Sequence, residues 1–331
     1  MTINQTILIT GGAGFIGSNL CDAFIDKGFH VVCLDNFSTG KRENIQHLID
    51  NPRFSLIEGD IREPNDCAKA AHGADFVLHQ AALGSVPRSI NDPATSNNVN
   101  VGGFVNMLVA ARDAGVKRFV YAASSSTYGD SKNLPKIEDH IGKPLSPYAV
   151  TKYVNELYAE VFARTYGISC VGLRYFNVFG KRQDPNGAYA AVIPLWVKQL
   201  INLKPPIING DGSFSRDFTY IDNVIEANYK ALMASEENLK TCEGFSNQVF
   251  NIAYGNNTTL VQLFETLKLN LAKYEPRIGK IEPIFGAQRP GDIPHSLASI
   301  EKAKKLIGYD PQFSAQQGFA LACEWYWNNL K

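Results

Sequence analysis

The stretch SPYAVTKYVNELY, which begins at residue 146, contains three tyrosines and a single lysine. A helix that begins near Ser146, a good N-cap residue, places Tyr148 beside Lys152, because residues four apart share one helical face. A phenol ionises near pH 10, and a neighbouring ammonium group favours its charged form. The pair therefore indicates a tyrosine that acts as a base. The alternative is an ordinary amphipathic helix, and we assign Tyr153 and Tyr158 to packing.

Three consecutive serines, Ser124 to Ser126, end the apolar run RFVYAAS and begin the segment after it. Serines at the end of a strand often form turns. In the same region of the fold as Tyr148, however, the Ser124 hydroxyl can hydrogen-bond the substrate oxygen from which the tyrosine removes a proton. Ser124 is therefore the third candidate catalytic residue.

The elements that must position these residues follow from the hydrophobic pattern. Up to about residue 180, near-continuous apolar runs alternate with segments of helical spacing, as in a parallel sheet whose strands are buried on both faces. We predict an α/β fold: a Rossmann-like doubly wound parallel sheet in residues 1–180, to which residues of about 215–255 return, and a smaller C-terminal α/β lobe made mainly by 181–331. The expected strands are residues 6–10, 30–35, 54–60, 75–81, 118–124 and 169–176.

Gly11, Gly14 and Gly17 form a G-x-x-G-x-x-G pattern directly after the first expected strand and at the start of a helix. Glycines there permit a tight turn and let backbone N–H groups and the helix N-terminus approach a pyrophosphate. The pattern alone is weak, but here it has the strand and the helix that it requires. Residues 1–180 are therefore predicted to bind a dinucleotide.

Two aspartates extend this prediction along the dinucleotide. Asp35 ends the second expected strand, where a carboxylate accepts hydrogen bonds from the adenosine ribose. A carboxylate there repels a 2′-phosphate, so the sequence favours NAD over NADP, although Lys41 and Arg42 weaken this preference. Asp60, which ends the third expected strand, is placed either to reach the adenine or to cap a helix.

The composition excludes several classes of partner. The 32 Lys and Arg residues balance 32 Asp and Glu, so the formal net charge is zero, which argues against nucleic acid or an anionic membrane. No apolar run approaches the roughly 20 residues of a membrane span, and the N-terminus does not resemble a signal peptide. Six scattered cysteines are expected to be reduced core residues of a cytoplasmic protein, and no metal site is predicted.

The glycine pattern, the serine cluster and the Y-x-x-x-K of Tyr148 and Lys152 occur in the order and spacing of one known group of proteins. Over essentially its whole length, the chain resembles the extended, sugar-nucleotide-modifying branch of the short-chain dehydrogenase/reductase superfamily. The resemblance implies NAD, whose positive nicotinamide ring would help to ionise Tyr148. The cofactor contacts expected are Gly11, Gly14, Phe15, Ile16, Gly17, Asp35, Asn36, Ser38, Thr39, Gly40, Asp60, Ile61, Gln80, Ala81, Ala82, Tyr148, Lys152 and Tyr175.

Removal of hydride from a sugar carbon gives a ketose, and the next step defines the enzyme. Dehydratases of this branch carry Thr-Asp-Glu where this chain has Ser124, Ser125 and Ser126, so elimination lacks its acid and base. The resemblance therefore implies that hydride returns to the other face of the ketose, which is C4 epimerisation with NAD retained. A net dehydrogenase and a non-catalytic, NAD-sensing scaffold on the same fold are the alternatives.

The resemblance also implies a UDP-sugar substrate held by the smaller lobe. Asn177, in RYFNVFG, lies where the family contacts the diphosphate. Arg216 and Arg289 match two arginines that clamp it with charge-assisted hydrogen bonds. Residues 191–194 and 207–210 match the segments that hold the uracil.

One position bears on the sugar. UDP-galactose 4-epimerases restricted to plain hexoses have a bulky aromatic residue four positions after the aspartate of an R-x-G-D loop; here Ser296 follows Asp292 at that spacing. The missing ring leaves room for an N-acetyl group, as in the bacterial UDP-N-acetylglucosamine 4-epimerases that the chain resembles most, which supply surface polysaccharide assembly. Pro294 stands where we expect an arginine, so a preference for a uronic acid stays open. A UDP-glucose 4-epimerase of relaxed specificity is the alternative. The expected substrate contacts are Gly84, Ser85, Ser124, Ser125, Ser126, Asn177, Gln183, Ala191, Val192, Ile208, Asn209, Gly210, Arg216, Arg289, Asp292 and Ser296.

Members of the family usually form homodimers by packing two long helices of each subunit into a four-helix bundle. Here those helices are expected in residues 102–115 and in the segment that follows Ser146. Periodicity cannot tell whether apolar residues of the second helix face a partner or the core; these are Val154, Leu157, Val161 and Phe162. We expect a homodimer.

Overall fold

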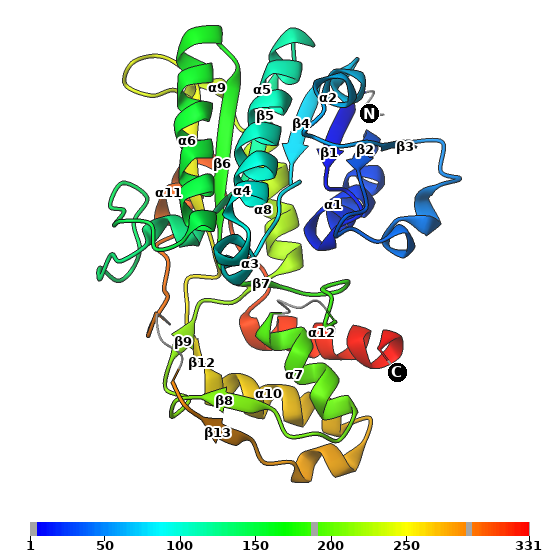
Figure 1. Cartoon of the computed structure of the whole chain (residues 1–331), viewed down its shortest axis with the longest axis vertical. Coiled ribbons are helices and arrows are strands. Elements are labelled where there is room, and N and C mark those ends of the chain that lie inside the picture. The colour runs from blue at the N-terminus through cyan, green and yellow to red at the C-terminus, as the bar shows by residue number, and fades with distance from the viewer. Residues whose placement is uncertain (1–4, 187–190, 289–292, 331) are drawn as a thin grey trace.

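A central sheet of seven parallel strands organises the computed structural model, which describes residues 5–186, 191–288 and 293–330 (Figure 1). The strand order is β11-β6-β5-β4-β1-β2-β3, and helices cover both faces, so the predicted doubly wound α/β fold is confirmed. The strands are β1 (Thr6–Thr10), β2 (His30–Asp35), β3 (Phe54–Glu58), β4 (Phe76–His79), β5 (Arg118–Ser124), β6 (Ser169–Tyr175) and β11 (Asn247–Ile252).

Three strands end earlier than the apolar pattern predicts, β6 by the single residue 176 and the other two by two residues each. β3 ends at Glu58 rather than at residue 60, and β4 ends at His79 rather than at residue 81. The residues that follow, Gly59–Asp60 and Gln80–Ala81, leave the sheet and line a cavity at the carboxyl ends of the strands. The order of the strands reverses at β1, which lies between β4 and β2, and such a switch point is where open α/β sheets bind ligands.

Each face of the sheet has its own layer of helices. The layer of α2, α5 and α6 encloses one cluster of buried apolar residues, and the layer of α1, α8 and α11 belongs to a second cluster that continues into the smaller lobe. These helices are α1 (Phe15–Asp26), α2 (Pro64–Ala71), α5 (Gly103–Asp113), α6 (Pro147–Tyr166), α8 (Ile221–Met233) and α11 (Glu301–Ile307); the short helices α3 (Val86–Asn91), α4 (Pro93–Asn97) and α9 (Glu236–Leu239) complete this part.

Helix α6 begins and ends as its sequence predicts. The Ser146 hydroxyl accepts a hydrogen bond from the Ala149 N–H at 3.1 Å, and Pro147 occupies the first helical position. Gly167 ends the helix in the left-handed conformation, at φ 72°. The helix packs against β5 and β6, which fixes its first turn near the end of β5.

The smaller lobe is built from helices α7, α10 and α12 and from short strands (Figure 1). The strands pair in two-stranded sheets: β8 with β13, β9 with β12, and β7 with β10. These elements are β7 (Val178–Phe179), α7 (Val192–Ile201), β8 (Ile207–Asn209), β9 (Ser215–Arg216), β10 (Thr219–Tyr220), β12 (Thr258–Thr259), α10 (Leu260–Ala272), β13 (Ile284–Gly286) and α12 (Ala315–Asn329).

The cysteines and the helices bear on two further expectations. Five of the six cysteines are buried, but Cys242 is exposed, so the prediction of six core cysteines is wrong at that position, which lies in the connection between α9 and β11. All six are free thiols. In the described parts of the chain, no helix combines the length and the apolar character needed to cross a bilayer.

Candidate active site

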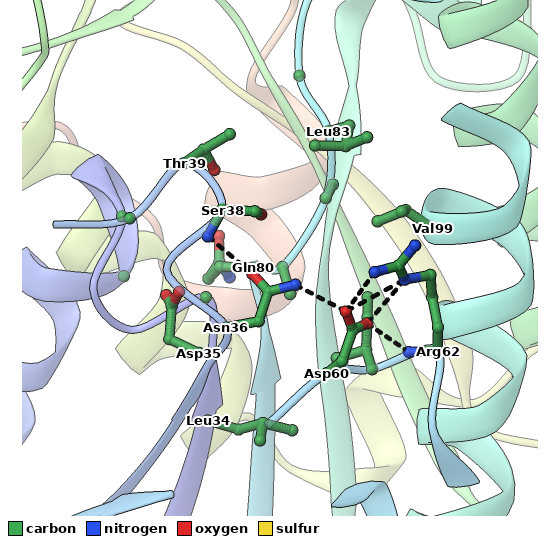
Figure 2. Close-up of a pocket in the computed structure, with 18 of the residues that line it drawn as sticks. Leu34, Asp35, Asn36, Ser38, Thr39, Asp60, Arg62, Gln80, Leu83 and Val99 are labelled. Atoms are coloured by element: carbon green, nitrogen blue, oxygen red, sulfur yellow. Dashed lines mark hydrogen bonds and ion pairs between the residues drawn. The ribbon is translucent and has the colours of Figure 1, made fainter. Parts of the chain in front are cut away.

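A cavity of about 400 Å³ opens where the chain leaves β1, β2, β3 and β4 (Figure 2). Every expected cofactor residue from Gly11 through Ala82 lines it, and so does Gly84. Tyr148, Lys152 and Tyr175, on α6 and β6, are not part of this lining. Sequence reasoning missed the remaining lining residues, which are Leu34, Gly59, Arg62, Leu83, Thr95 and Val99.

The glycine loop is folded so tightly on itself that side chains do not fit. A Cβ on Gly17 would lie 2.0 Å from the Gly11 carbonyl oxygen, and Gly11 itself has φ +67°. No side chain caps the start of α1, so the N–H groups of its first turn remain available to an anion. The loop therefore fits the pyrophosphate of a dinucleotide.

Asp35 is held rigidly at the end of β2 (Figure 2). Its carboxylate accepts hydrogen bonds from the N–H groups of Ala13 at 2.9 Å and Phe37 at 2.8 Å. Burial raises the pKa of Asp35, and these two hydrogen bonds oppose the rise. The carboxylate thus lies beside the glycine loop, where the sequence places the adenosine ribose.

Asp60 is bound by a residue that sequence reasoning missed. Arg62 donates to its carboxylate from Nη2 at 2.6 Å and from Nε at 3.0 Å, and Asn36 donates from Nδ2 at 2.8 Å (Figure 2). These groups, Arg62 above all, lower the pKa of Asp60 to about 2. The N-cap of α2 is Glu63, so the alternative that Asp60 caps this helix is wrong. The sequence GDIR, residues 59–62, does place an arginine two positions after Asp60, and this spacing could have indicated the pair.

Tyr148 and Ser124 meet where α6 begins and β5 ends. A hydrogen bond between their side chains lowers the pKa of Tyr148, but burial raises it by more. In the protein alone the pKa of Tyr148 is therefore raised, which is the opposite of the ionised tyrosine predicted above. Ionisation at neutral pH requires a further positive charge at the site. Ser124 also accepts hydrogen bonds from the N–H and the hydroxyl of Ser126, at 3.1 and 2.8 Å, so it forms the turn as well.

Lys152 is buried one turn after Tyr148, with 3% of its surface exposed. Its Nζ donates to the Ala122 carbonyl on β5 at 2.7 Å. Burial lowers the pKa of Lys152 to about 8. The first turn of α6 is fixed from the other side by Ser89 on α3, whose hydroxyl accepts a hydrogen bond from the Tyr148 N–H at 3.0 Å.

Tyr175 connects this region to the cavity. Its hydroxyl contacts Gln80, a cavity residue, at 3.2 Å, and accepts a hydrogen bond from Asn228 Nδ2 at 2.9 Å. Asn228 lies on α8 and is fully buried. Sequence reasoning missed it, because no pattern pairs residues 53 positions apart.

Two of the expected diphosphate residues, Asn177 and Arg216, lie at or beside one short segment, residues 215–219. Asn177 donates from Nδ2 to the Asp217 carbonyl at 3.0 Å, and the Ser296 N–H donates to the Ser215 carbonyl at 3.1 Å. The side chain of Asp217 is fully buried, and it accepts hydrogen bonds from three backbone N–H groups, those of residues 254, 255 and 298, at 3.1 to 3.3 Å. Asp217, which follows Arg216, therefore connects that segment to residues 254–255 and to residue 298, two positions after Ser296.

The other expected substrate residues are distributed over both parts of the chain. Ser85 caps α3. Ala191 is the N-cap residue of α7, and Val192 is the first residue of that helix. Ile208 is buried in β8, Asn209 ends that strand, and Gly210 follows it with φ 75°. Gln183 donates to the Val178 carbonyl at 3.1 Å and lines a separate cavity of about 430 Å³ with Arg182. Ser125 and Ser126 form the turn after β5. Arg289 and Asp292 lie outside the described residues.

Comparison with known proteins agrees with this arrangement. The model of the NAD dependent epimerase/dehydratase family matches residues 7–253. A putative UDP-glucose 4-epimerase from Methanocaldococcus jannaschii is 35% identical over 98% of this chain and 99% of its own length. Among solved structures, a UDP-N-acetylglucosamine 4-epimerase from Methanobrevibacter ruminantium, in complex with UDP-N-acetylmuramic acid, is 35% identical over 98% of both chains, with a TM-score of 0.88. A UDP-glucuronic acid 4-epimerase from Bacillus cereus, with UDP-glucuronic acid and NAD, is 32% identical over 99% of this chain and all of that one, with a TM-score of 0.84.

Proposed function

This chain belongs to the NAD dependent epimerase/dehydratase family, and we propose that it is an NAD-dependent 4-epimerase of UDP-sugars that prefers UDP-N-acetylglucosamine and UDP-N-acetylgalactosamine. The observation that carries the epimerase assignment is the contact of Tyr148 with Ser124, next to serines where a dehydratase needs carboxylates. The relatives above act, by their names, on glucose, N-acetylglucosamine and glucuronic acid forms of the UDP-sugar. These proteins differ in the sugar that their names give, so the proposed preference rests on this chain's own residues.

The residues of the chain have separate tasks in this reaction. NAD, when held by the glycine loop, would supply the acceptor for the C4 hydride and its donor when the hydride is returned to the opposite face of the sugar. Tyr148 takes the proton of the C4 hydroxyl and later gives it back to the same oxygen, to which Ser124 donates a hydrogen bond. Lys152, charged and buried, favours the ionised form of Tyr148. The glycine loop and Asp35 hold the cofactor.

Ser296 supports the preference for an acetylated sugar. Its side chain is small and half-buried, and its backbone is bound to Ser215, the residue before Arg216. A side chain of this size, on the segment that pairs with the strand of Arg216, leaves space for an N-acetyl group. Products of this kind are precursors of surface polysaccharides.

Proton NMR of the anomeric region tests the proposed function. Purified protein is mixed separately with UDP-N-acetylglucosamine, UDP-glucose and UDP-glucuronic acid, with no NAD added. We expect the galacto signal to appear fastest from the acetylated sugar. Faster conversion of UDP-glucose or UDP-glucuronic acid would leave the epimerase and remove the N-acetyl preference. Conversion of none of them, even after NAD is added, would refute the assignment.

Changing Ser296→Tyr should suppress turnover of the acetylated sugar and spare the plain one. The new ring occupies the space assigned to the N-acetyl group, and a steric loss of about 1–3 kcal/mol corresponds to a 10- to 200-fold fall in kcat/KM. The measurement is kcat/KM for the two UDP-sugars. The control is Ser55→Tyr, at an exposed position of edge strand β3, which should leave both values unchanged. An equal loss for both sugars would show that Ser296 is not in the sugar pocket.

Changing Asp217→Ala should raise KM for the UDP-sugar about tenfold with a smaller effect on kcat. The substitution leaves three buried backbone N–H groups without their acceptor, which releases the loops around Arg216 and Ser296. Steady-state kinetics and the NAD content of the purified variant are measured together. Asp211→Ala, at an exposed position between β8 and β9, is the control. A lowered Tm with unchanged KM would contradict the positioning of these loops by Asp217.

We further infer that the protein is a homodimer formed through α5 and α6, which lie side by side on one face of the sheet (Figure 1). Four apolar residues of α6 share one stripe and are 39–49% exposed: Val150, Leu157, Tyr158 and Val161. Phe162 instead faces the core and Val154 is half-buried. An apolar stripe of this kind on a long surface helix supports a partner helix.

Changing Val161→Glu should convert the dimer into a monomer, because it places a charge in the middle of this stripe. Sedimentation velocity of the two proteins gives the result directly. Leu269→Glu is the control, since Leu269 is 64% exposed on α10 in the smaller lobe. A monomeric wild type, or dissociation by both substitutions alike, would refute the interface.

A further inference from the structure

The helical stripe that carries Tyr148 and Lys152 has a third member. Glu156 follows Lys152 by four residues, and its side chain is only 6% exposed. Its carboxylate accepts two hydrogen bonds from Arg174 on β6, from Nε at 2.9 Å and from Nη2 at 2.7 Å. A buried, bidentate ion pair thus lies one helical turn from the buried lysine.

Arg174 is itself fixed on two further sides. Its Nη1 donates to the Glu138 carbonyl at 2.8 Å, and its guanidinium group lies 4.9 Å from the centre of the Tyr128 ring. Buried ion pairs are often no more stabilising than apolar residues of the same size, so the stability of the fold does not explain why this pair is present.

The direction of the Lys152 side chain suggests what the pair does. A lysine and a glutamate four residues apart on a helix attract each other. Because Arg174 binds both oxygens of Glu156, Lys152 is left to donate to Ala122, two residues before Ser124. The Glu156 charge still raises the pKa of Lys152, against the larger effect of burial.

The other titratable groups near Lys152 and its neighbouring ion pair do not replace this charge. Lys302 on α11, whose pKa is lowered by burial and raised by Glu138 and Glu156, carries no negative charge. His79 on β4 has its pKa lowered to about 3 by burial and by Lys152, so it is neutral. Tyr121 on β5 is neutral because burial holds its pKa well above the ordinary value. Tyr148, on the same helix, is protonated in the protein alone. Glu156 is therefore the nearby carboxylate that supports the charge of Lys152.

We propose that Glu156 and Arg174 are positioning residues for the epimerisation: the pair keeps Lys152 charged and directed toward the end of β5, where it acts on Tyr148. This proposal rests on the proposed function. Arg174 prevents the carboxylate from drawing the lysine away, and Glu156 supplies the negative charge that a buried ammonium group requires.

The first test is Glu156→Gln, which keeps the shape of the side chain and removes its charge. We expect kcat to fall about tenfold, KM for the UDP-sugar to stay within about twofold, and the alkaline limb of the kcat profile to move down by about one pH unit, since the pKa of Lys152 falls. The matched control is Glu160→Gln, one turn further along α6, where the carboxylate pairs with Arg164 at the surface. The control should match the wild type in all three quantities.

A double variant separates positioning from folding. Replacing both partners, Glu156→Leu with Arg174→Met, leaves neither member of the ion pair as an unpaired buried charge. Lys152 keeps its hydrogen bond to Ala122, so the Tm should stay close to the wild-type value. We expect its kcat and its alkaline limb to remain shifted as in Glu156→Gln. Wild-type kinetics in the double variant, or a fall in kcat with an unmoved alkaline limb in Glu156→Gln, would overturn the proposal.

A titration of Lys152 by NMR, with 13C in the lysine ε-methylene groups, reads its pKa without turnover. Loss of the Lys152 signal in Lys152→Met assigns it. An inactive wild type would refute the proposed function, whereas an unchanged Lys152 pKa in Glu156→Gln would refute the role of the pair. The two failures are therefore distinguishable.

Discussion

Changing Tyr148→Phe should lower kcat for epimerisation by about three orders of magnitude while the purified protein keeps its NAD. The substitution removes the hydroxyl that accepts and returns the C4 proton, and general acid–base groups contribute about 10²–10⁴-fold to a rate. Folding should be little affected, because the ring remains and the Tyr148 N–H still reaches Ser89. The anomeric proton signals give the rate, and the absorbance of nucleotide released by acid gives the NAD content.

Tyr158→Phe is the matched control, since Tyr158 lies on the same helix and is 39% exposed. It should retain the wild-type rate. Full activity in Tyr148→Phe would disprove the mechanism, and loss of NAD together with activity would show that the substitution acts through cofactor binding instead.

Changing Gly17→Ala should abolish NAD retention and lower Tm by several degrees. The new methyl group would lie 2.0 Å from the Gly11 carbonyl oxygen and 2.8 Å from the Gly12 Cα, and both neighbours are backbone atoms that cannot rotate away. Overpacking of this kind costs about 3 kcal/mol or more, whereas the better helix propensity of alanine returns only about 1 kcal/mol. The loop must therefore open, and its N–H groups lose the arrangement that fits a pyrophosphate.

Thermal unfolding, with and without added NAD, checks this result. The control is Gly279→Ala, because a Cβ at that position makes only an ordinary contact, at 3.5 Å from the Ala272 Cβ. The control should retain NAD and the wild-type Tm. A Gly17→Ala protein that purifies with a full complement of NAD would show that the tight approach of the loop is not required.

The features that the sequence predicts well are those set by neighbouring residues. The glycine loop, the cap of α6 at Ser146 and the strand ends near Asp35 and Ser124 all depend on short-range spacing, and the structure places them as expected. Asp60 was harder, because its place after β3 is compatible with both a ligand contact and a helix cap. The direction of the Arg62 side chain that binds it is not set by local spacing.

The features that were missed depend on segments far apart in the chain. The partners Glu156 and Arg174 lie on α6 and β6, and Asn228 reaches Tyr175 from α8. The pKa of Tyr148 rises in the protein alone because burial is a property of the whole fold, which no local pattern measures. The exposure of Cys242 is likewise a property of the whole fold, which its sequence neighbours do not determine.

The position of β11 has a consequence for synthesis of the chain. This strand completes the sheet beside β6, but about 70 residues separate the end of β6 from its start, and part of the smaller lobe lies between them. At roughly 5–20 residues per second, a ribosome exposes the unpaired edge of β6 for several seconds before its neighbour emerges. An open edge is a template for association with other chains. A fragment cut near residue 180 would keep that edge unpaired permanently, so the chain cannot be divided there into two independent domains.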